Sequence, residues 1–353
     1  MSSPGSEPPA GTSLGEAALV ADTGERALIE RIRQRLPPAP AEVLVGIGDD
    51  AAVAEPERGA LQVVTTDALV EGVHFDRRFS SAADIGYKAL AVNVSDVASM
   101  GGVTRLALLS LMLPAGTSVA DVDSLLDGLL LMAASTRVTL VGGNITRSPG
   151  PLVVDVTAIG SVRRRRVLTR AGGRAGDWLY VTGAVGAAVA GLEWLRDRAT
   201  DPASEPSDGT LADCVARHRR PEPRARIGAL LGRTRAASAC MDASDGLADA
   251  VSQMAAQSGT GATIDAAALP IHPGARRWFE SRGRDPVRSS LGGSDDYELV
   301  FAVSKKARSR LRSVVRDARG VPITRIGELT ADREVSLVRH GEAEPLPSGF
   351  VHF

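Results

Sequence analysis

The stretch that decides the fold is DIGYKALAVNVSDVASMGG, residues 84–102. Its apolar residues recur at helical spacing and two glycines close it, so the segment predicts a helix. Ile85, Ala89, Val92 and Asp96 are spaced by four, three and four positions and therefore share one helix face. A carboxylate on that apolar face is costly to bury unless it is hydrogen-bonded, paired or bound to a metal. Asp96 is therefore expected to be functional; the structural alternative is a carboxylate that caps a neighbouring loop.

Extended and helical segments alternate on both sides of this helix, which is typical of an α/β protein. Further helices are expected at 24–37 and 119–136, and strands at 61–69, 106–114, 138–144, 152–162 and 177–183. A basic, glycine-rich segment at 163–176 marks a domain junction, and residues 196–223 have the composition of a loop or a mobile helix pair. We therefore predict a disordered tail over 1–23, an N-terminal domain over 24–165 and a C-terminal domain over 166–353.

The composition narrows the function classes. The chain of 353 residues is 44% hydrophobic and 24% charged, which suits a globular protein. Its net charge of −1 gives no support for nucleic acid or an anionic membrane as a partner. No apolar stretch has the length of a membrane span, and the N-terminus lacks the pattern of a signal peptide. Two isolated cysteines, Cys214 and Cys240, favour a reducing, cytoplasmic setting.

Acidic residues cluster in turn-like or strand-ending segments at five places. They are Asp50 in VGIGDDAAV (45–53), Asp67 in VVTTDAL (63–69), Asp96, the pair Asp242 and Asp245 in MDASDGL (241–247), and Asp295 in GGSDDYELVF (292–301). Ordinary structural interpretations exist: an Asp–Gly turn, a turn that ends a strand, or a helix N-cap formed by Ser244 or Asp245. Asp67 follows Thr65 and Thr66 at the expected end of a strand, where threonine oxygens and a carboxylate suit a hard cation.

Several common catalytic motifs are absent from the sequence. There is no GxxxxGK[ST] phosphate loop, no protein-kinase HRD or DFG motif, no HExxH and no GxSxG. The only lysines are Lys88, Lys305 and Lys306, so phosphate recognition would fall mainly to arginines, backbone N–H groups and metal ions. Oxygen-rich motifs without a Cys/His set favour Mg²⁺. Mg²⁺ held between carboxylates and phosphates points to phosphoryl transfer.

Seven motifs in a fixed order give the chain a family resemblance. They are GIGDDAAV, TTDALVEGVHF, YKALAVNVSDVASMGG, VGGNITR, VLTRAGGRAGDWLYVTG, MDASDGLADAV and GGSDDYELVF. The series closely resembles the thiamine-monophosphate kinase family, from about residue 24 to the final SGFVHF. That family belongs to an ATP-binding superfamily with aminoimidazole-ribonucleotide synthetase, selenophosphate synthetase and the hydrogenase maturation factor HypE.

The resemblance implies a fold, a reaction and partners. It implies an α/β (α+β) homodimer of two-domain subunits with the aminoimidazole-ribonucleotide-synthetase-like fold, dimerised through the N-terminal domains. It also implies ATP as co-substrate, several Mg²⁺ ions in the cleft between the domains, and thiamine phosphate as the acceptor that becomes thiamine diphosphate. Positions that match the family's Mg²⁺ ligands are Asp50, Thr65, Thr66, Asp67, Asp96, Asn144, Asp242 and Asp245; nucleotide contacts are matched by Gly143, Asn144, Arg170 and Ser244; and contacts to thiamine phosphate are matched by His74, Asp295 and Phe350.

Two residues depart from the family pattern. Asn144 stands where many members carry an Asp in a GGD motif, which would weaken one metal contact, and Asp295 stands where others have Glu. Three alternatives stay open: a HypE-like enzyme, a selenophosphate-synthetase-like enzyme, and a catalytically silent nucleotide-binding protein. The first ends in a Cys-containing tail, whereas this chain ends in Val-His-Phe. The second needs a reactive Cys or selenocysteine near its N-terminus, and this chain has no Cys before Cys214.

Overall fold

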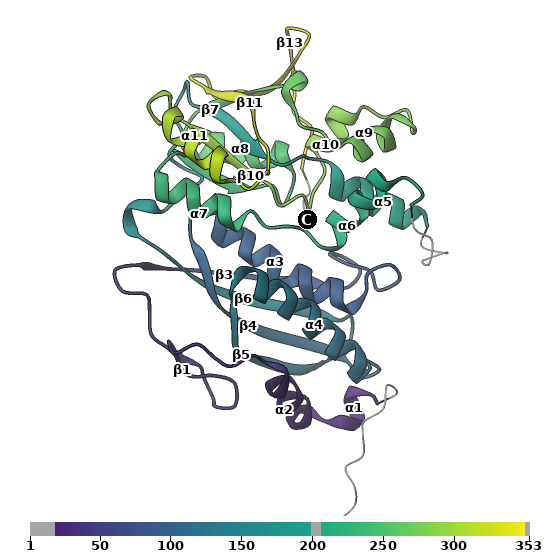
Figure 1. Cartoon of the computed structure of the whole chain (residues 1–353). Coiled ribbons are helices and arrows are strands. Elements are labelled where there is room, and N and C mark those ends of the chain that lie inside the picture. The colour runs from purple at the N-terminus through teal and green to yellow at the C-terminus, as the bar shows by residue number, and fades with distance from the viewer. Residues whose placement is uncertain (1–17, 199–205, 350–353) are drawn as a thin grey trace, which may run out of the picture.

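The computed structural model describes residues 18–198 and 206–349. It contains a four-stranded and a seven-stranded sheet, and helix α3 (Ala82–Ser99) lies between the two halves of the chain (Figure 1). The predicted α/β (α+β) fold class is confirmed. Within these described residues, no helix is both long and apolar enough to cross a membrane.

The N-terminal half is built on a four-stranded sheet of order β3-β6-β4-β5. Its strands are β3 (Leu61–Val70), β4 (Val103–Pro114), β5 (Thr139–Ser148) and β6 (Val153–Val162). β6 pairs antiparallel with β3 and β4, whereas β4 and β5 are parallel. Alternate residues of β6, such as Val154 and Val156, are buried on the face covered by α3 and α4 (Val119–Thr136). The other face, called the open face below, carries the alternate set, including Val64, Thr66 and Asn144.

Helix α3 begins at a capping box formed by Ser81 and Asp84. It is buried along most of its length, because α4 and the sheet cover one side while α7 (Ala225–Thr234) and β8 (Ala239–Asp242) contact the other. The spacing predicts one buried face, but the helix is buried on two sides. We call it the shared helix below, because both halves of the chain pack against it.

Two glycines explain how closely α3 and α4 pack. A Cβ added at Gly86 of α3 would lie 1.8 Å from the carbonyl oxygen of Leu125, and one added at Gly128 of α4 would lie 1.8 Å from that of Ala83. Glycine in a helix interior costs about 1 kcal/mol relative to alanine. Here that cost is offset because the two backbones can touch.

The C-terminal half is built on a seven-stranded sheet of order β13-β12-β9-β11-β7-β10-β8, with helices around it. Its strands are β7 (Trp178–Thr182), β8, β9 (Gly261–Asp265), β10 (Leu299–Val303), β11 (Ile323–Thr330), β12 (Val335–Arg339) and β13 (Glu342–Pro345). Its helices are α5 (Ala187–Asp197), α6 (Gly209–Arg219), α7, α8 (Leu247–Ser258), α9 (Pro273–Glu280), α10 (Pro286–Leu291) and α11 (Arg308–Asp317). Strand β10 is buried at every position, because its alternate residues belong to two apolar clusters, one with Val300 and Ala302 and the other with Leu299, Phe301 and Val303.

Three local expectations need correction. The predicted tail over 1–23 is too long: residues 1–17 lie outside the described residues, but α1 (Val20–Thr23) is a helical turn in which Val20 is buried and its N–H donates to Thr117 O at 3.0 Å. Asp67 is not at the end of a strand, since β3 continues to Val70. The region 196–223 contains α6, which packs against α5 and α9.

The first strands and helices complete the N-terminal half. After α1 come α2 (Glu25–Arg35), which is the helix predicted over 24–37, and the short hairpin of β1 (Val43–Val45) and β2 (Val53–Ala54). We propose that the domain boundary lies near residue 165, as predicted, because β6 ends the first sheet at Val162 and β7 begins the second at Trp178.

Candidate active site

Two carboxylates meet where β3 passes α3. Thr65 and Asp67 are two residues apart on β3 and therefore point to the same, helix-covered face of the sheet. The Thr65 hydroxyl donates to Asp96 Oδ2 at 2.6 Å, and the charge of the Asp96 carboxylate acts on Asp67. Burial, reinforced by the Asp96 charge, raises the pKa of Asp67 to about 6. Burial likewise raises the pKa of Asp96.

Asp242 joins this pair from the other half of the chain. It is buried at the end of β8, and its Oδ2 accepts a hydrogen bond of 2.6 Å from Ser95 Oγ on α3. Burial, followed by the charge of Asp96, raises the pKa of Asp242 to about 7. The charge of Asp245 also acts on Asp67. Asp67, Asp96, Asp242 and Asp245 form what we call the four-carboxylate cluster.

The segment after β8 contributes Asp245 to the four-carboxylate cluster and does not cap a helix. An N-cap role for Ser244 or Asp245 is wrong, because Gly246 is the N-cap residue of α8 and no side chain caps that helix. Ser244 is half-buried, and its carbonyl oxygen accepts from the Asp295 N–H at 2.8 Å. This bond ties the MDASDGL motif to the GGSDDYELVF motif.

The cluster has the donor chemistry of a Mg²⁺ site. Burial and neighbouring carboxylates raise the pKa values of Asp67 and Asp242, which a bound cation would offset, and hard oxygen donors suit Mg²⁺. Across residues 18–198 and 206–349, no three His, Cys, Asp or Glu side chains already surround one point at ligand distance. Mg²⁺ normally takes one or two protein carboxylates and completes its shell with waters and substrate phosphates. The residues therefore fit Mg²⁺ bound together with phosphate groups.

Asp96 lines two cavities. One, of about 570 Å³, extends from Asp67 and Asp96 past Asp245 to His74 and Asp295. The other, of about 450 Å³, lies on the far side of Asp96, between apolar residues of β3 and β6 and the side chain of Arg170. The charge of Arg170 acts on Asp96 and lowers its pKa against the effect of burial. The four-carboxylate cluster thus borders two separate binding spaces.

The larger cavity brings His74 and Asp295 together through a lysine. The Val70 N–H donates to His74 Nδ1 at 3.1 Å, which leaves the proton of a neutral ring on Nε2. Lys88 of α3 is buried, and its Nζ lies 3.0 Å from Asp295 Oδ2 and 3.3 Å from the His74 carbonyl oxygen. Two residues predicted from opposite ends of the chain therefore meet at one ammonium group.

Asp295 lies in a conformationally strained loop. Both Asp295 (φ 70°) and Tyr297 (φ 50°) have left-handed backbone conformations, which are uncommon for residues other than glycine. The neighbouring Asp296 accepts from the N–H groups of Gly186 and Ala188 at 2.6 and 3.1 Å, and so holds the start of α5. Strain of this kind persists where the surroundings hold it, and it is concentrated at functional sites.

Asn144 and Gly143 lie away from the cluster within this chain. They are on β5, one edge of the four-stranded sheet, whereas Asp67 is on β3, the other edge. Three strand spacings separate these edges, about 14 Å. A Cβ at Gly143 would lie 1.8 Å from Leu109 O, so close packing against β4 is sufficient to explain a glycine at this position. Thr66 points to the open face, where its hydroxyl donates to Asp155 Oδ1 at 2.9 Å.

The remaining predicted residues have simpler settings. Asp50 is exposed in the loop between β1 and β2, and its N–H donates to Asp49 Oδ1 at 2.9 Å. This fits the turn interpretation of the motif, and a metal contact by Asp50 stays a prediction. Arg170 is exposed and donates to Gln253 Oε1 at 2.6 Å. Phe350 lies outside the described residues.

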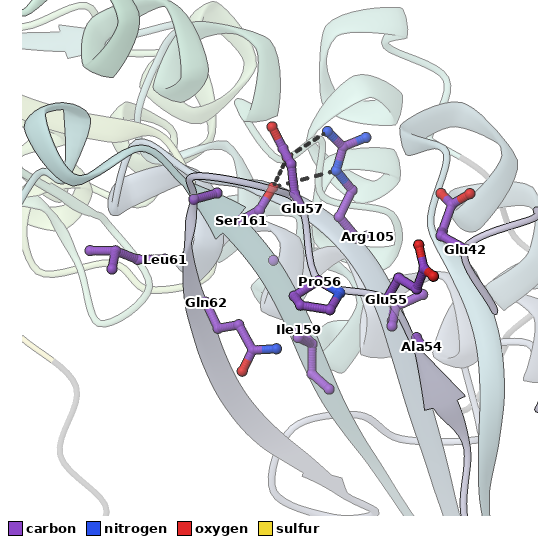
Figure 2. A pocket seen from close by; sticks show the side chains of 13 residues that line it. Glu42, Ala54, Glu55, Pro56, Glu57, Leu61, Gln62, Arg105, Ile159 and Ser161 are labelled. Carbon is purple, nitrogen blue, oxygen red and sulfur yellow. Dashed lines mark hydrogen bonds and ion pairs between the residues drawn. The ribbon is translucent and has the colours of Figure 1, made fainter. Parts of the chain in front are cut away.

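A third cavity, of about 310 Å³, lies apart from these residues on the open face (Figure 2). Glu57 Oε2 accepts there from Ser161 Oγ at 2.6 Å and from Arg105 Nη2 at 3.1 Å. Ser161 and then Arg105 outweigh burial and lower the pKa of Glu57. None of the predicted site residues that the structure describes lines this cavity, so we do not assign it to the reaction.

Sequence reasoning missed Lys88, His218 and Ser95 as site residues. Lys88 carried a usable signal, because it is one of only three lysines and lies in a mostly apolar helix, eight residues before Asp96. His218 lines the larger cavity from α6. This helix lies in the region for which the sequence pattern predicts a loop or a mobile helix pair. Nothing in the sequence marks Ser95 as the partner of a residue 147 positions away.

The fold and the site define a class of protein, and comparisons with known proteins agree. Residues 48–162 match the N-terminal domain of AIR synthase related proteins, and residues 174–340 match the C-terminal domain of the same class. The thiamine-monophosphate kinase of Escherichia coli (strain K12) is 39% identical over 94% of this chain and 98% of its own, and that of Bacillus subtilis (strain 168) is 35% identical over 80% and 84%. The chain belongs to the thiamine-monophosphate kinase family.

Solved structures give the same result. The thiamine-monophosphate kinase of Stenotrophomonas maltophilia K279a superposes with a TM-score of 0.80 at 36% identity, over 90% of this chain and 96% of that one. AaThiL in complex with AMPPCP and TMP gives a TM-score of 0.73 at 31% identity, over 94% and 98%. HypE in complex with ATP gives 0.72 at only 19% identity, which is a likeness of fold alone. The predicted resemblance is confirmed.

Proposed function

We propose that the protein transfers the terminal phosphoryl group of ATP to thiamine phosphate, giving ADP and thiamine diphosphate. The observation that carries this proposal is the position of Asp96, which joins a four-carboxylate cluster and borders two cavities at once. Transfer of a phosphoryl group between two bound phosphate esters needs cation-binding residues at the point where the two binding cavities meet. The family relative AaThiL, solved with AMPPCP and TMP, supports two ligands of this kind.

The two cavities suit the two substrates. The smaller one has apolar walls from β3 and β6 for a base and Arg170 at its rim for a phosphate. The larger one offers the His74 ring and the Asp295 carboxylate, which suit the aminopyrimidine or the cationic thiazolium of thiamine phosphate. Both substrates would then point their phosphates at the four-carboxylate cluster.

The chemistry requires no strong general base. The nucleophile is a phosphate oxygen of thiamine phosphate, which is already anionic at neutral pH. Bound Mg²⁺ supplies charge neutralisation for the transferring group. Asp67, Asp96, Asp242 and Asp245 would hold it, while His74 and Asp295 orient the acceptor for in-line attack. The residues of the chain therefore act by positioning and by electrostatics.

The active form that we propose is a homodimer through the N-terminal half. On the open face of the sheet, Val64 is 61% exposed and Leu106, Leu108 and Met112 are half-buried. Among the residues that the structure describes, no further strand pairs with the outer edges of β3 and β5, and unpaired edges invite pairing with another copy. If β3 of one copy adjoins β5 of the other, Asn144 of the partner subunit comes near Thr66 and Asp67. We also propose a cytoplasmic location, supported by two free thiols, Cys214 and Cys240.

The decisive experiment measures ADP production by the purified full-length chain. We expect ATP- and Mg²⁺-dependent turnover with thiamine phosphate, and none with aminoimidazole precursors or selenide as acceptors. Turnover with selenide would support the selenophosphate-synthetase-like alternative. ATP binding without turnover on any acceptor would support a silent nucleotide-binding protein.

A further inference from the structure

The buried Lys88 ammonium links three parts of the molecule. Lys88 is on α3, its side chain is 4% exposed, and it donates to Asp295 Oδ2 at 3.0 Å and to His74 O at 3.3 Å. The His74 carbonyl follows β3, whereas Asp295 belongs to the loop before β10. A buried lysine is rare unless it is paired, and this one is paired to a carboxylate that lines a cavity.

Lys88 leaves Asp295 able to accept from a ligand. A carboxylate has about four acceptor positions. Lys88 occupies one on Oδ2, and the Tyr297 hydroxyl makes a long contact of 3.3 Å with Oδ1. Burial alone would raise the pKa of Asp295, but the Lys88 ammonium outweighs it and lowers that pKa. Asp295 is therefore an oriented anion with acceptor capacity left toward the cavity.

A second observation points to a ligand at the same place. His218 lines the same cavity from α6, and its Nδ1 lies 3.7 Å from Asp295 Oδ2, too far for a hydrogen bond. In the described part of the chain, this fully buried nitrogen has no hydrogen-bond partner. Burial and the nearby Lys88 charge lower the pKa of His218 to about 3, so the ring is neutral. A buried, unpaired polar nitrogen in a cavity wall normally has a partner of its own.

We propose that Lys88 is a positioning residue for the acceptor substrate: it fixes the Asp295 carboxylate and the His74 loop so that they, with His218, bind an amino-bearing or cationic nitrogen heterocycle. This inference rests on the proposed function, and it assigns the heterocycle end of the acceptor to the Lys88 end of the cavity. A purely structural role, in which Lys88 only holds the two halves together, is the competing explanation.

The test compares Lys88→Met, which keeps the length of the side chain without its charge, with Lys305→Met, an exposed lysine elsewhere. Calorimetry measures the Kd of thiamine phosphate without ATP, and kinetics measures the KM of each substrate. We expect Lys88→Met to weaken thiamine phosphate binding by about 10- to 100-fold, the loss of one hydrogen bond to a charged group. The KM of ATP and all values of Lys305→Met should stay unchanged.

Two further variants keep the proposal falsifiable if Lys88→Met fails to fold. Lys88→Arg should restore part of the affinity because it keeps a cation. Asp295→Asn should weaken thiamine phosphate binding. The double variant Lys88→Met/Asp295→Asn should bind thiamine phosphate no more weakly than the single variant with the lower affinity, since Lys88 acts through Asp295. Unchanged thiamine phosphate affinity in the folded variants, or equal changes for both substrates, would overturn the inference. Wild-type protein that binds thiamine phosphate but makes no ADP would instead contradict the proposed function.

Discussion

At the residue scale, the closeness of the Asp67 and Asp96 carboxyl groups is the most informative feature of the site. Neighbouring carboxylates repel each other, and burial together with the Asp96 charge raises the pKa of Asp67. A divalent cation would attract both carboxylates and offset this repulsion. The pair is therefore suited to a site that binds positive charge.

We predict that Asp67→Asn and Asp96→Asn each lower kcat by about a thousandfold or more at saturating Mg²⁺. Losing one carboxylate that holds the metal should cost several kcal/mol of transition-state stabilisation, about 4 kcal/mol for this factor. Circular dichroism and urea unfolding should show a native fold. Asp127→Asn, on the exposed side of α4, is the matched control and should be fully active. Near-normal rates in either cluster variant would remove that residue from the metal site.

Asn144 gives a second prediction at this scale. Asn144→Asp should keep the enzyme active and lower the half-saturating Mg²⁺ concentration by a few-fold. An amide oxygen can ligate Mg²⁺ but lacks the Coulombic attraction of a carboxylate, and Asn144 is exposed, so solvent screens the gain. Mg²⁺ titrations of the initial rate measure the effect. Superimposable titrations would mean that position 144 does not touch a metal.

At the element scale, the contact between α3 and α4 sets the position of Lys88, Ser95 and Asp96. Gly128→Ala would insert a Cβ 1.8 Å from Ala83 O, so the helices must separate. We expect a loss of about 1–3 kcal/mol in the free energy of unfolding from overpacking, partly offset by better helix propensity. Urea denaturation followed by circular dichroism provides the measurement.

The matched control for this variant is Gly116→Ala. Gly116 lies in the turn after β4, where an added Cβ would meet nothing within 4 Å. Its stability should stay within about 0.5 kcal/mol of wild type. Equal stability of both variants would show that the close approach of the two helices does not constrain the fold.

The same scale shows what sequence reasoning can reach. The helix at 84–102 was predictable because the apolar spacing and the closing glycines agree locally, and the motif order indicated which carboxylates belong together. The pairing of Ser95 with Asp242, and of Lys88 with Asp295, was not, because each depends on how two sheets dock. The helical turn of α1 was missed because one buried side chain, Val20, leaves no periodic pattern.

At the scale of the whole molecule, the strand order separates Asn144 from Asp67 and makes the dimer testable. Asn144→Lys should inactivate, because it places a cation beside the expected metal. If Asn144 serves the site of the partner subunit, mixing this variant with Asp67→Asn restores activity. A mixed dimer then has one intact site, so random mixing gives about one quarter of the wild-type rate. Mixing Asp67→Asn with Asp96→Asn should restore nothing, and failure of the first mixture would place Asn144 outside the shared site.

The shared helix α3 also restricts where insertions and deletions can occur in this chain. Lys88 and Asp96 are eight residues apart on one continuous helix, a separation of about 12 Å along its axis. One end is proposed to position the heterocycle of the acceptor and the other the phosphates. Inserting or deleting a single residue between them would turn one group by about 100° relative to the other. Substitutions can accumulate in this interval, but chains that retain the activity should keep seven residues between the two positions.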